Sequence, residues 1–281
     1  MSTVLKCLKR GTQFLKSAGV PEAALSAELL LSHLLQAPRF SLHLDSDRAV
    51  EGPLVEKFET LLGKRAGRYP IQYLVREVGF RNVSLEVGEG CLIPRPETET
   101  LVQVVLERIG NIQEELNLLD IGTGSGNIAV SIAKERPWKV TATDVSQKAL
   151  YYGRKNADRN QVADQISFVE TDLCKGLEFG RFDAIISNPP YLSHHELALL
   201  QPEVGFEPLL ALRGGEDGLY FFRRIAAEAV LVLKKNGFIF FEVGIGQTEA
   251  VRKVLETHGF HSIEISKDDA GIDRIVSGVL N

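Results

Sequence analysis

The sequence has little that would bind a metal or form disulfide bonds. Its 281 residues include only three cysteines, and Cys7, Cys91 and Cys174 are too widely spaced for a disulfide framework or a CxxC metal site. None of the six histidines belongs to an HExxH or HxxxH motif, and the adjacent His194 and His195 fit a solvated loop better than a metal site. We therefore predict no metal.

Long hydrophobic runs are also missing. There is no stretch of 18 uninterrupted apolar residues, and Lys6, Lys9 and Arg10 interrupt the region where a signal peptide has its apolar core. We therefore predict a soluble, cytoplasmic protein with no membrane partner. The formal net charge of −5 argues against nucleic acid as the main partner, although a local basic patch is compatible with that total.

Residues 1–75 are predicted to form a small helical bundle. Apolar side chains recur at helical spacing over 5–15, 27–35 and 54–62, and Pro21 suits the first position of the second helix. Helices of this kind bury their apolar stripes against one another. The segment carries no residues that suggest chemistry, so a structural cap and a docking module for a partner protein are equally supported.

Residues 76–90 are predicted to form a β-hairpin linker to a second domain, residues 91–281, because hydrophobicity alternates loosely there. The second domain opens with two prolines that flank Arg95, followed by Glu97 and Thr98. The prolines fix an extended approach, and a helix then begins at Glu97 or Thr98. This turn is either a brace at the domain boundary or part of a site.

A glycine-rich turn joins a buried strand to a helix and is typical of nucleotide-type binding. The strand over 116–121 contains Asp120, and the turn after it consists of Gly122, Thr123, Gly124, Ser125 and Gly126. Glycines permit close approach of the backbone, and the N-terminus of the helix attracts anionic groups. The GxGxG spacing differs from the GxGxxG of dinucleotide-binding folds, which disfavours an NAD-dependent dehydrogenase, and no GxxxxGK[ST] loop is present.

Acidic residues follow the next two predicted strands. Asp144 comes after the strand over 140–143, in the region where related folds hold a ribose. Asp172 and Leu173 follow the strand over 166–169, in a position suited to an adenine. Each aspartate alone is explained as a helix cap. Three in series, counting Asp120, favour a ligand that contains adenosine.

The strand predicted over 182–187 ends at Asn188, which is followed by Pro189, Pro190 and Tyr191, and we expect this tyrosine to be exposed. The carboxyl ends of strands are where open α/β sheets bind ligands. A primary amide is a poor nucleophile, so a site that alkylates it should accept both of its N–H hydrogens. The Asn188 Oδ1 and the Pro189 carbonyl supply two acceptors, and Tyr191 offers a flat face. A strand-ending turn is the alternative explanation.

The remaining pattern completes an α/β fold. A helix over 219–233, a strand over 238–243 and a closing pair over 261–265 and 274–279 predict a seven-stranded sheet, mostly parallel with an antiparallel last strand. Glu242, at the end of one strand, is a possible wall of the site, although such a residue is more often simply solvated.

Taken together, these motifs resemble those of Rossmann-like, S-adenosylmethionine-dependent methyltransferases. More narrowly, the chain is similar over essentially its whole length to the peptide chain release factor N5-glutamine methyltransferase family. The shared motifs are Ile93-Pro-Arg-Pro-Glu-Thr-Glu99, Asp120-Ile-Gly-Thr-Gly-Ser-Gly126, Asn188-Pro-Pro-Tyr191, Glu207-Pro208 and Gly214-Gly-Glu-Asp-Gly-Leu219. The chain departs from the usual pattern of the family at Arg76, Asn82, Leu173 and Arg213.

The resemblance implies methyl transfer from S-adenosylmethionine to the glutamine of the Gly-Gly-Gln motif of class-I release factors, a step that tunes translation termination. It implies that residues 91–281 form the catalytic domain and that residues 1–75 help to dock the factor. The implied cofactor-binding residues are Asp120, Gly122, Thr123, Gly124, Ser125, Gly126, Asp144, Asp172, Leu173 and Asn188. The implied catalytic residues are Asn188, Pro189 and Tyr191, and the implied substrate-binding residues add Pro190, Arg95 and Glu97, with Thr98 nearby.

Two alternatives remain beside this interpretation. The Asn-Pro-Pro-Tyr motif is shared with amino-methyltransferases that act on adenine or cytosine in nucleic acid. A binding protein that holds the cofactor but has lost activity would carry the same motifs.

Overall fold

The computed structural model describes residues 2–112 and 114–281, which divide into two compact units. The first contains the chain up to Glu77 together with Gln201–Phe206, and the second contains Val78–Leu200 and Glu207–Asn281. The sequence pattern gave no sign that Gln201–Phe206 contributes to the first unit.

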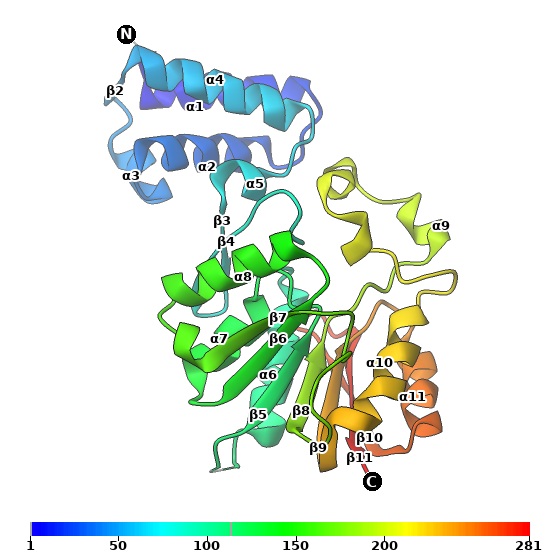
Figure 1. The fold of residues 1–281 in the computed structure, drawn as a ribbon. Coiled ribbons are helices and arrows are strands. Elements are labelled where there is room, and N and C mark those ends of the chain that lie inside the picture. The colour runs from blue at the N-terminus through cyan, green and yellow to red at the C-terminus, as the bar shows by residue number, and fades with distance from the viewer. Residues whose placement is uncertain (1, 113) are drawn as a thin grey trace. The chain divides into compact units, whose positions relative to one another are not determined.

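The first unit is a helical bundle, as predicted (Figure 1). Its helices bury their apolar stripes in one core that includes Leu15, Leu30 and Phe58. The second helix begins at Ala23 and not at Pro21, because Glu22 precedes it in a left-handed conformation with φ 50°. The elements are β1 (Ser2–Thr3), α1 (Val4–Ser17), α2 (Ala23–Leu35), α3 (Arg39–Leu44), β2 (Ala49–Val50), α4 (Gly52–Ala66) and α5 (Ile71–Val75).

A cluster of charged side chains holds Gln201–Phe206 in the first unit. Glu203, in the short 3-10 helix η2 (Pro202–Phe206), accepts hydrogen bonds from Arg65 Nη1 at 2.9 Å and Arg68 Nη2 at 2.7 Å. Burial raises the pKa of Glu203, but the hydrogen bonds from Arg68 and Arg65 outweigh it and lower the pKa to about 2. Phe206 also packs edge-on against Tyr69, with 5.1 Å between the ring centroids.

Within the described residues, the second unit contains a seven-stranded sheet in the order β10-β11-β9-β8-β5-β6-β7. The pairs β5–β6, β5–β8, β6–β7 and β8–β9 are parallel, whereas β11 runs antiparallel to both β9 and β10. The predicted sheet, with its antiparallel last strand, is confirmed. The strands are β5 (Asn117–Ile121), β6 (Lys139–Asp144), β7 (Ile166–Glu170), β8 (Phe182–Ser187), β9 (Leu233–Glu242), β10 (Phe260–Lys267) and β11 (Asp273–Leu280).

Helices cover both faces of this sheet (Figure 1). Alternate strand residues point to opposite faces, so Leu118 and Leu119 enter two different cores. One core is shared with α6 (Glu97–Ile109), α7 (Asn127–Glu135) and α8 (Gln147–Arg159), and the other with α10 (Tyr220–Val232) and α11 (Thr248–Thr257). The smaller elements are the two-stranded sheet of β3 (Glu77–Phe80) and β4 (Val83–Glu86), η1 (Ala163–Gln165), α9 (His194–Leu197) and η3 (Leu209–Ala211).

One boundary differs from the prediction. The strand expected to begin at Phe238 begins at Leu233, directly after α10. Leu233 pairs with Phe182 of β8, and an irregularity in register separates this pair from the regular ladder that follows. The Asn236-Gly237 sequence lies inside the strand, where Asn236 has φ 62°.

Candidate active site

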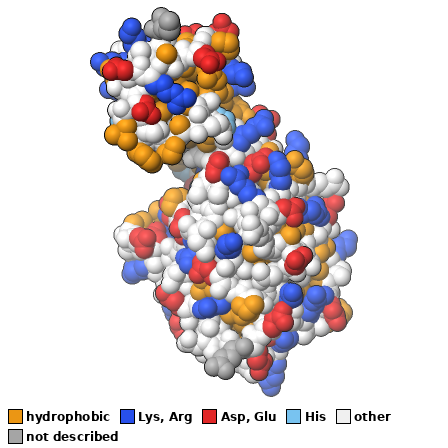
Figure 2. Space-filling model, turned by 90° about the vertical axis from the view of Figure 1, so that its left-hand side faces the viewer, with side chains coloured by type: hydrophobic (Ala, Val, Ile, Leu, Met, Phe, Trp, Pro, Cys, Tyr) orange, Lys and Arg blue, Asp and Glu red, His pale blue; other side chains and the backbone are white. Residues whose placement is uncertain are grey.

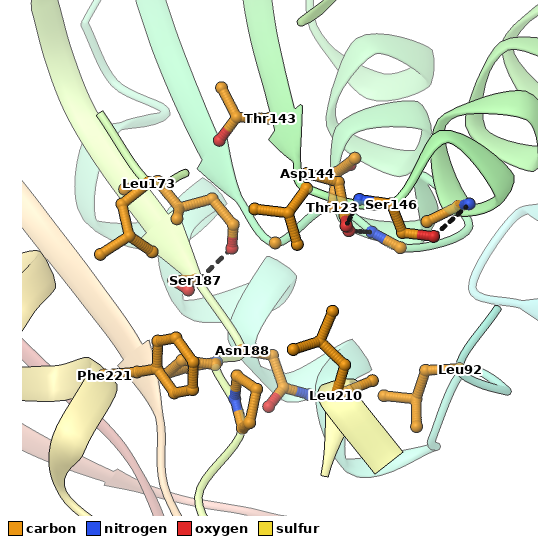
Figure 3. Close-up of a pocket in the computed structure, with 18 of the residues that line it drawn as sticks. Leu92, Thr123, Thr143, Asp144, Ser146, Leu173, Ser187, Asn188, Leu210 and Phe221 are labelled. Atoms are coloured by element: carbon orange, nitrogen blue, oxygen red, sulfur yellow. Dashed lines mark hydrogen bonds between the residues drawn. The ribbon is translucent and has the colours of Figure 1, made fainter. Parts of the chain in front are cut away.

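A cavity of about 420 Å³ lies at the carboxyl ends of β5, β6, β7 and β8 in the second unit. The sheet places β6 and β8 on opposite sides of β5, so the order of strands reverses there, and open α/β sheets bind ligands at such a point. In Figure 3, Thr123 and Asp144 lie on one side of the cavity, and Asn188 and Leu210 lie on the other. The sequence-predicted loop and strand tip therefore share one site.

The glycine turn after β5 forms one wall. Gly122 and Gly124 have φ of 71° and 55°, a region that other residues rarely adopt, and a Cβ on either would meet no atom within 4 Å. The backbone there is open to a close ligand. Gly126 has a different role, because its Cβ would lie 3.2 Å from the Cα of Gly153 in α8. It permits α7 and α8 to approach each other and is not in the cavity wall.

Asp144 lies at the cavity and also holds the glycine turn. Its Oδ2 accepts the N–H of Gly124 at 3.0 Å and its Oδ1 accepts the N–H of Ser146 at 2.9 Å. Burial raises the pKa of Asp144 against the effect of these hydrogen bonds. The carboxylate is therefore fixed by backbone donors at the place predicted for a ribose contact.

Asp120 holds the glycine turn through a hydrogen bond with Thr123. Its side chain is fully buried and is absent from the cavity wall, and Thr123 Oγ1 donates to its Oδ2 at 2.6 Å. Burial raises the pKa of Asp120 to about 7. The three aspartates that look alike in the sequence thus differ in position: Asp144 and Asp172 line the cavity, and Asp120 holds a residue that does.

The side of the cavity where the sequence predicts an adenine contains a cation that sequence analysis missed. Asp172 and Leu173, which the sequence predicts at this side, both line the cavity. The cation is Arg224 of α10, which pairs with Asp172 at 2.9 Å. Tyr220 and Phe221, from the start of the same helix, complete the wall. These residues follow the Gly214–Leu219 motif in the chain, which was the available signal that this segment belongs to the site.

The tip of β8 meets the glycine turn and α6. Ser187 Oγ donates to the Ile121 carbonyl at 2.8 Å, which ties β8 to β5 (Figure 3). Asn188 Nδ2 donates to Thr98 Oγ1 at 3.0 Å, and within the described residues no protein donor is bonded to the Asn188 Oδ1. Asn188, Pro189 and Pro190 all line the cavity.

Tyr191 is not exposed, contrary to the expectation from the sequence. It is half-buried and packs against the core shared with α10 and α11. Burial raises the pKa of its phenol to about 12. Its ring lies close to the backbone of Gly244 and its carbonyl accepts from Gln247 Nε2 at 3.0 Å, so the residue anchors the tip on one side. It does not appear among the residues that line the cavity.

The proline turn before α6 is fixed by a buried acid. Glu207, 7% exposed, accepts the N–H of Ile93 at 2.9 Å and pairs with Arg95 Nη2 at 2.5 Å. Arg95 lines the cavity, but Glu97, predicted to bind substrate, does not. Pro208, Leu210 and Ala211, which follow Glu207, add an apolar wall.

Glu242 is neither solvated nor part of the cavity wall, so the structure agrees with neither expectation from the sequence. The residue ends β9, is 2% exposed, and its Oε2 has no hydrogen-bond partner. Burial raises its pKa to about 7.

No helix among residues 2–112 and 114–281 has both the length and the apolar character to cross a membrane. The same residues contain no group of three or more His, Cys, Asp or Glu side chains placed to hold a metal ion. On the face shown in Figure 2, basic and acidic side chains are interspersed, in keeping with the small net charge of −5.

Comparison with known proteins matches both parts of the chain. The model of the PrmC N-terminal domain matches residues 6–75, and that of the methyltransferase small domain matches residues 97–201. A release factor glutamine methyltransferase of Thermodesulfovibrio yellowstonii is 39% identical over 253 residues, covering 89% of this chain and 90% of that protein. One from Vibrio cholerae is 36% identical over 277 residues, covering 98% and 96%. A methyltransferase structure from Pyrococcus furiosus, 21% identical with a TM-score of 0.54, covers 71% of this chain and 89% of that one and shares the fold.

Proposed function

This chain belongs to the release factor glutamine methyltransferase family, and from that premise we propose that it methylates the glutamine of the Gly-Gly-Gln motif in class-I peptide chain release factors. The methyl group goes from S-adenosylmethionine to the side-chain amide nitrogen, N5. The reaction takes place in the cytoplasm, where the factor acts in translation termination.

One observation carries the proposal. Asn188 lines the cavity, its Nδ2 donates to Thr98, and among the described residues no donor is bonded to its Oδ1. A primary amide that enters the cavity can donate one hydrogen to Asn188 Oδ1 and the other to the Pro189 carbonyl. These two acceptors orient the nitrogen and stabilise the positive charge that develops on it during alkylation.

The residues present fit S-adenosylmethionine. The open backbone at Gly122 and Gly124 accepts a close ligand, the fixed Asp144 carboxylate suits ribose hydroxyls, and Leu173 and Phe221 supply apolar surface for a flat base. When bound, this group supplies an electrophilic methyl on a sulfonium. The protein therefore needs no covalent nucleophile of its own.

The remaining work of the protein is positioning. Holding reactants in a productive arrangement can remove roughly 7–11 kcal/mol of barrier in favourable cases. Because the alkylated amide nitrogen is very acidic, its proton can leave to water after transfer, so the proposal requires no strong general base. Tyr191 is proposed to support the amide plane from its half-buried place beside the tip.

The proposal is tested by incubating the purified protein with a class-I release factor and isotope-labelled S-adenosylmethionine, followed by peptide mass spectrometry. We expect one methyl on the Gly-Gly-Gln peptide and none on a factor whose glutamine is replaced by alanine. Asn188→Ala should lower kcat at least about 100-fold, as loss of a preorganised charge-stabilising group does elsewhere. Its affinity for S-adenosylmethionine, measured by calorimetry, should change little. Methylation of an oligonucleotide instead of the factor would refute the proposal in favour of a nucleic-acid substrate.

A further inference from the structure

Glu242 is a buried acid that the proposed reaction does not use. It lies beside the cavity without forming its wall, and one of its carboxyl oxygens, Oε2, is buried and has no hydrogen-bond partner. Placing a carboxylate at such depth costs stability unless the charge is paired or hydrogen-bonded, and among the described residues Oε2 is neither. Packing alone therefore does not account for a glutamate at this position.

Side chains from three other elements face this carboxyl. Thr98, in the first turn of α6, and Asn188, after β8, lie within hydrogen-bonding reach of it and favour its charged form. Arg274 of β11 also favours the charge, whereas Glu97 of α6 opposes it. The phenol of Tyr191 faces the same group. The carboxyl thus lies beside both members of the Asn188–Thr98 hydrogen bond.

The direction of these hydrogen bonds follows from what each group can donate. In its ionised form, which prevails as the pH rises above the raised pKa of about 7, the Glu242 carboxylate has no hydrogen and only accepts. A threonine hydroxyl that gives its single hydrogen to the carboxylate can only accept from Asn188. The Asn188 side chain must then turn its NH2 group toward Thr98 and Glu242, and its Oδ1 toward the cavity.

We propose that Glu242 is a positioning residue which, through Thr98, fixes the Asn188 carboxamide with its oxygen toward the substrate amide. An asparagine with the opposite orientation would present two donors to a substrate that is itself a donor. The inference rests on the proposed function, because only an amide or amine substrate needs an acceptor at that place.

The first test measures the Asn188 side chain directly in the full-length protein. With isotope-labelled asparagine, the Asn188 NH2 signal is assigned by its loss in Asn188→Asp. We expect its hydrogens to exchange with water at least about 10-fold faster in Glu242→Gln and in Thr98→Val than in the wild type, because a hydrogen bond in the buried network is lost or loses its fixed direction. In Thr98→Ser, which keeps the hydroxyl, the Asn188 NH2 hydrogens should exchange as slowly as in the wild type.

The second test measures turnover of the release factor by the same variants. Glu242→Gln and Thr98→Val should lower kcat about 10- to 100-fold, with the KM for S-adenosylmethionine unchanged and Thr98→Ser close to wild type. Matched controls are Thr100→Val on the same helix and Glu249→Gln, an exposed acid on α11, which should leave both readouts unchanged.

The outcomes separate the two proposals. A wild type that fails to methylate the factor, together with the expected change in exchange, would refute the substrate but keep the role of Glu242. Loss of kcat in folded variants with an unchanged Asn188 signal would overturn the positioning role. Wild-type kcat in both Glu242→Gln and Thr98→Val would overturn it as well.

Discussion

Gly214 offers the sharpest way to move the tip of β8 without touching a side chain of the site. Its N–H donates to the Leu192 carbonyl at 2.8 Å, so the two segments lie backbone to backbone. A Cβ at position 214 would lie 2.6 Å from the Cα of Tyr191, 2.7 Å from its carbonyl carbon and 2.8 Å from the Pro190 oxygen. All three are backbone atoms, which cannot rotate away.

The magnitude follows from these distances. Ordinary contacts with a Cβ begin near 3.4 Å, so Gly214→Ala must displace the Pro190–Tyr191 backbone by roughly 0.8 Å. Overpacking of this kind costs about 1–3 kcal/mol of stability. Asn188 precedes the displaced backbone by two residues. A misplacement near 1 Å can cost about 100-fold in rate, and we expect a fall in kcat of that order.

The assay compares kcat on a release factor, cofactor affinity by calorimetry and the free energy of unfolding in urea. Gly63→Ala is the matched control, because Gly63 lies inside α4 with open space around its Cβ position. That change should stabilise the protein by up to about 1 kcal/mol and leave kcat unchanged. If Gly214→Ala is folded and turns over at the wild-type rate, the position of this backbone does not control the reaction and the reasoning is wrong.

Three further predictions concern buried charges. Arg95→Met removes the cation that pairs with Glu207, whose side chain is 2% exposed. The free energy of unfolding in urea should fall by about 3 kcal/mol, because a buried charge is left without its partner. An unchanged free energy of unfolding would show that the pair is not stabilising. Glu203 has a pKa lowered to about 2 by its arginines, despite burial, so it adds stability above its unfolded pKa of 4.5 that is lost as the pH falls. Glu203→Gln should therefore cost up to roughly 3 kcal/mol at pH 7 and progressively less in acid; a cost independent of pH would contradict this. The pKa shift of Glu242 has the opposite sign, because burial raises its pKa to about 7. The folded state therefore keeps a proton that the unfolded state loses, and the free energy of unfolding falls as the pH rises from 4.5 through 7. Glu242→Gln should be more stable than wild type above pH 7, by up to roughly 3 kcal/mol, and equal to it in acid; urea titrations at several pH values that show no such trend would contradict the buried charge.

The sheet and the location of the site could be predicted because their signals are local. Buried strands such as Phe182–Ser187 are continuous apolar runs, and the glycine turn and the Asn188 tip directly follow strands. Parallel strands bring their carboxyl ends to one edge, so motifs 66 residues apart, at Gly122 and Asn188, were expected to meet. Boundaries were less certain. The strand that begins at Leu233 depends on pairing with β8, which periodicity does not reveal.

Contacts between distant residues were not predictable, because neither partner carries a local sign of the other. Thr98 reads as a residue that opens a helix, yet it holds Asn188, 90 residues away. Tyr191 follows two prolines, which suggested exposure, but the Gly244 backbone provides a surface on which it packs. In the sequence, Glu203 resembles any acid of a polar loop, and nothing near it indicates that Arg65 and Arg68 donate hydrogen bonds to it.

Asp120 and Glu242 show a common arrangement that the sequence conceals. Both are buried at strand ends, burial raises the pKa of both to about 7, and a threonine hydroxyl lies beside each carboxyl. Neither lines the cavity; Thr123 and Thr98, which do, are held between the acid and the ligand space. A buried acid is costly, but because it only accepts hydrogen bonds when ionised, it dictates the direction of the network in front of it. Of the acids that line the ligand space, Asp144 is instead held by backbone N–H groups and Asp172 by Arg224. Burial, and not residue type or position in the motif, therefore separates the acids that would contact the ligand from those that fix the residues in contact with it.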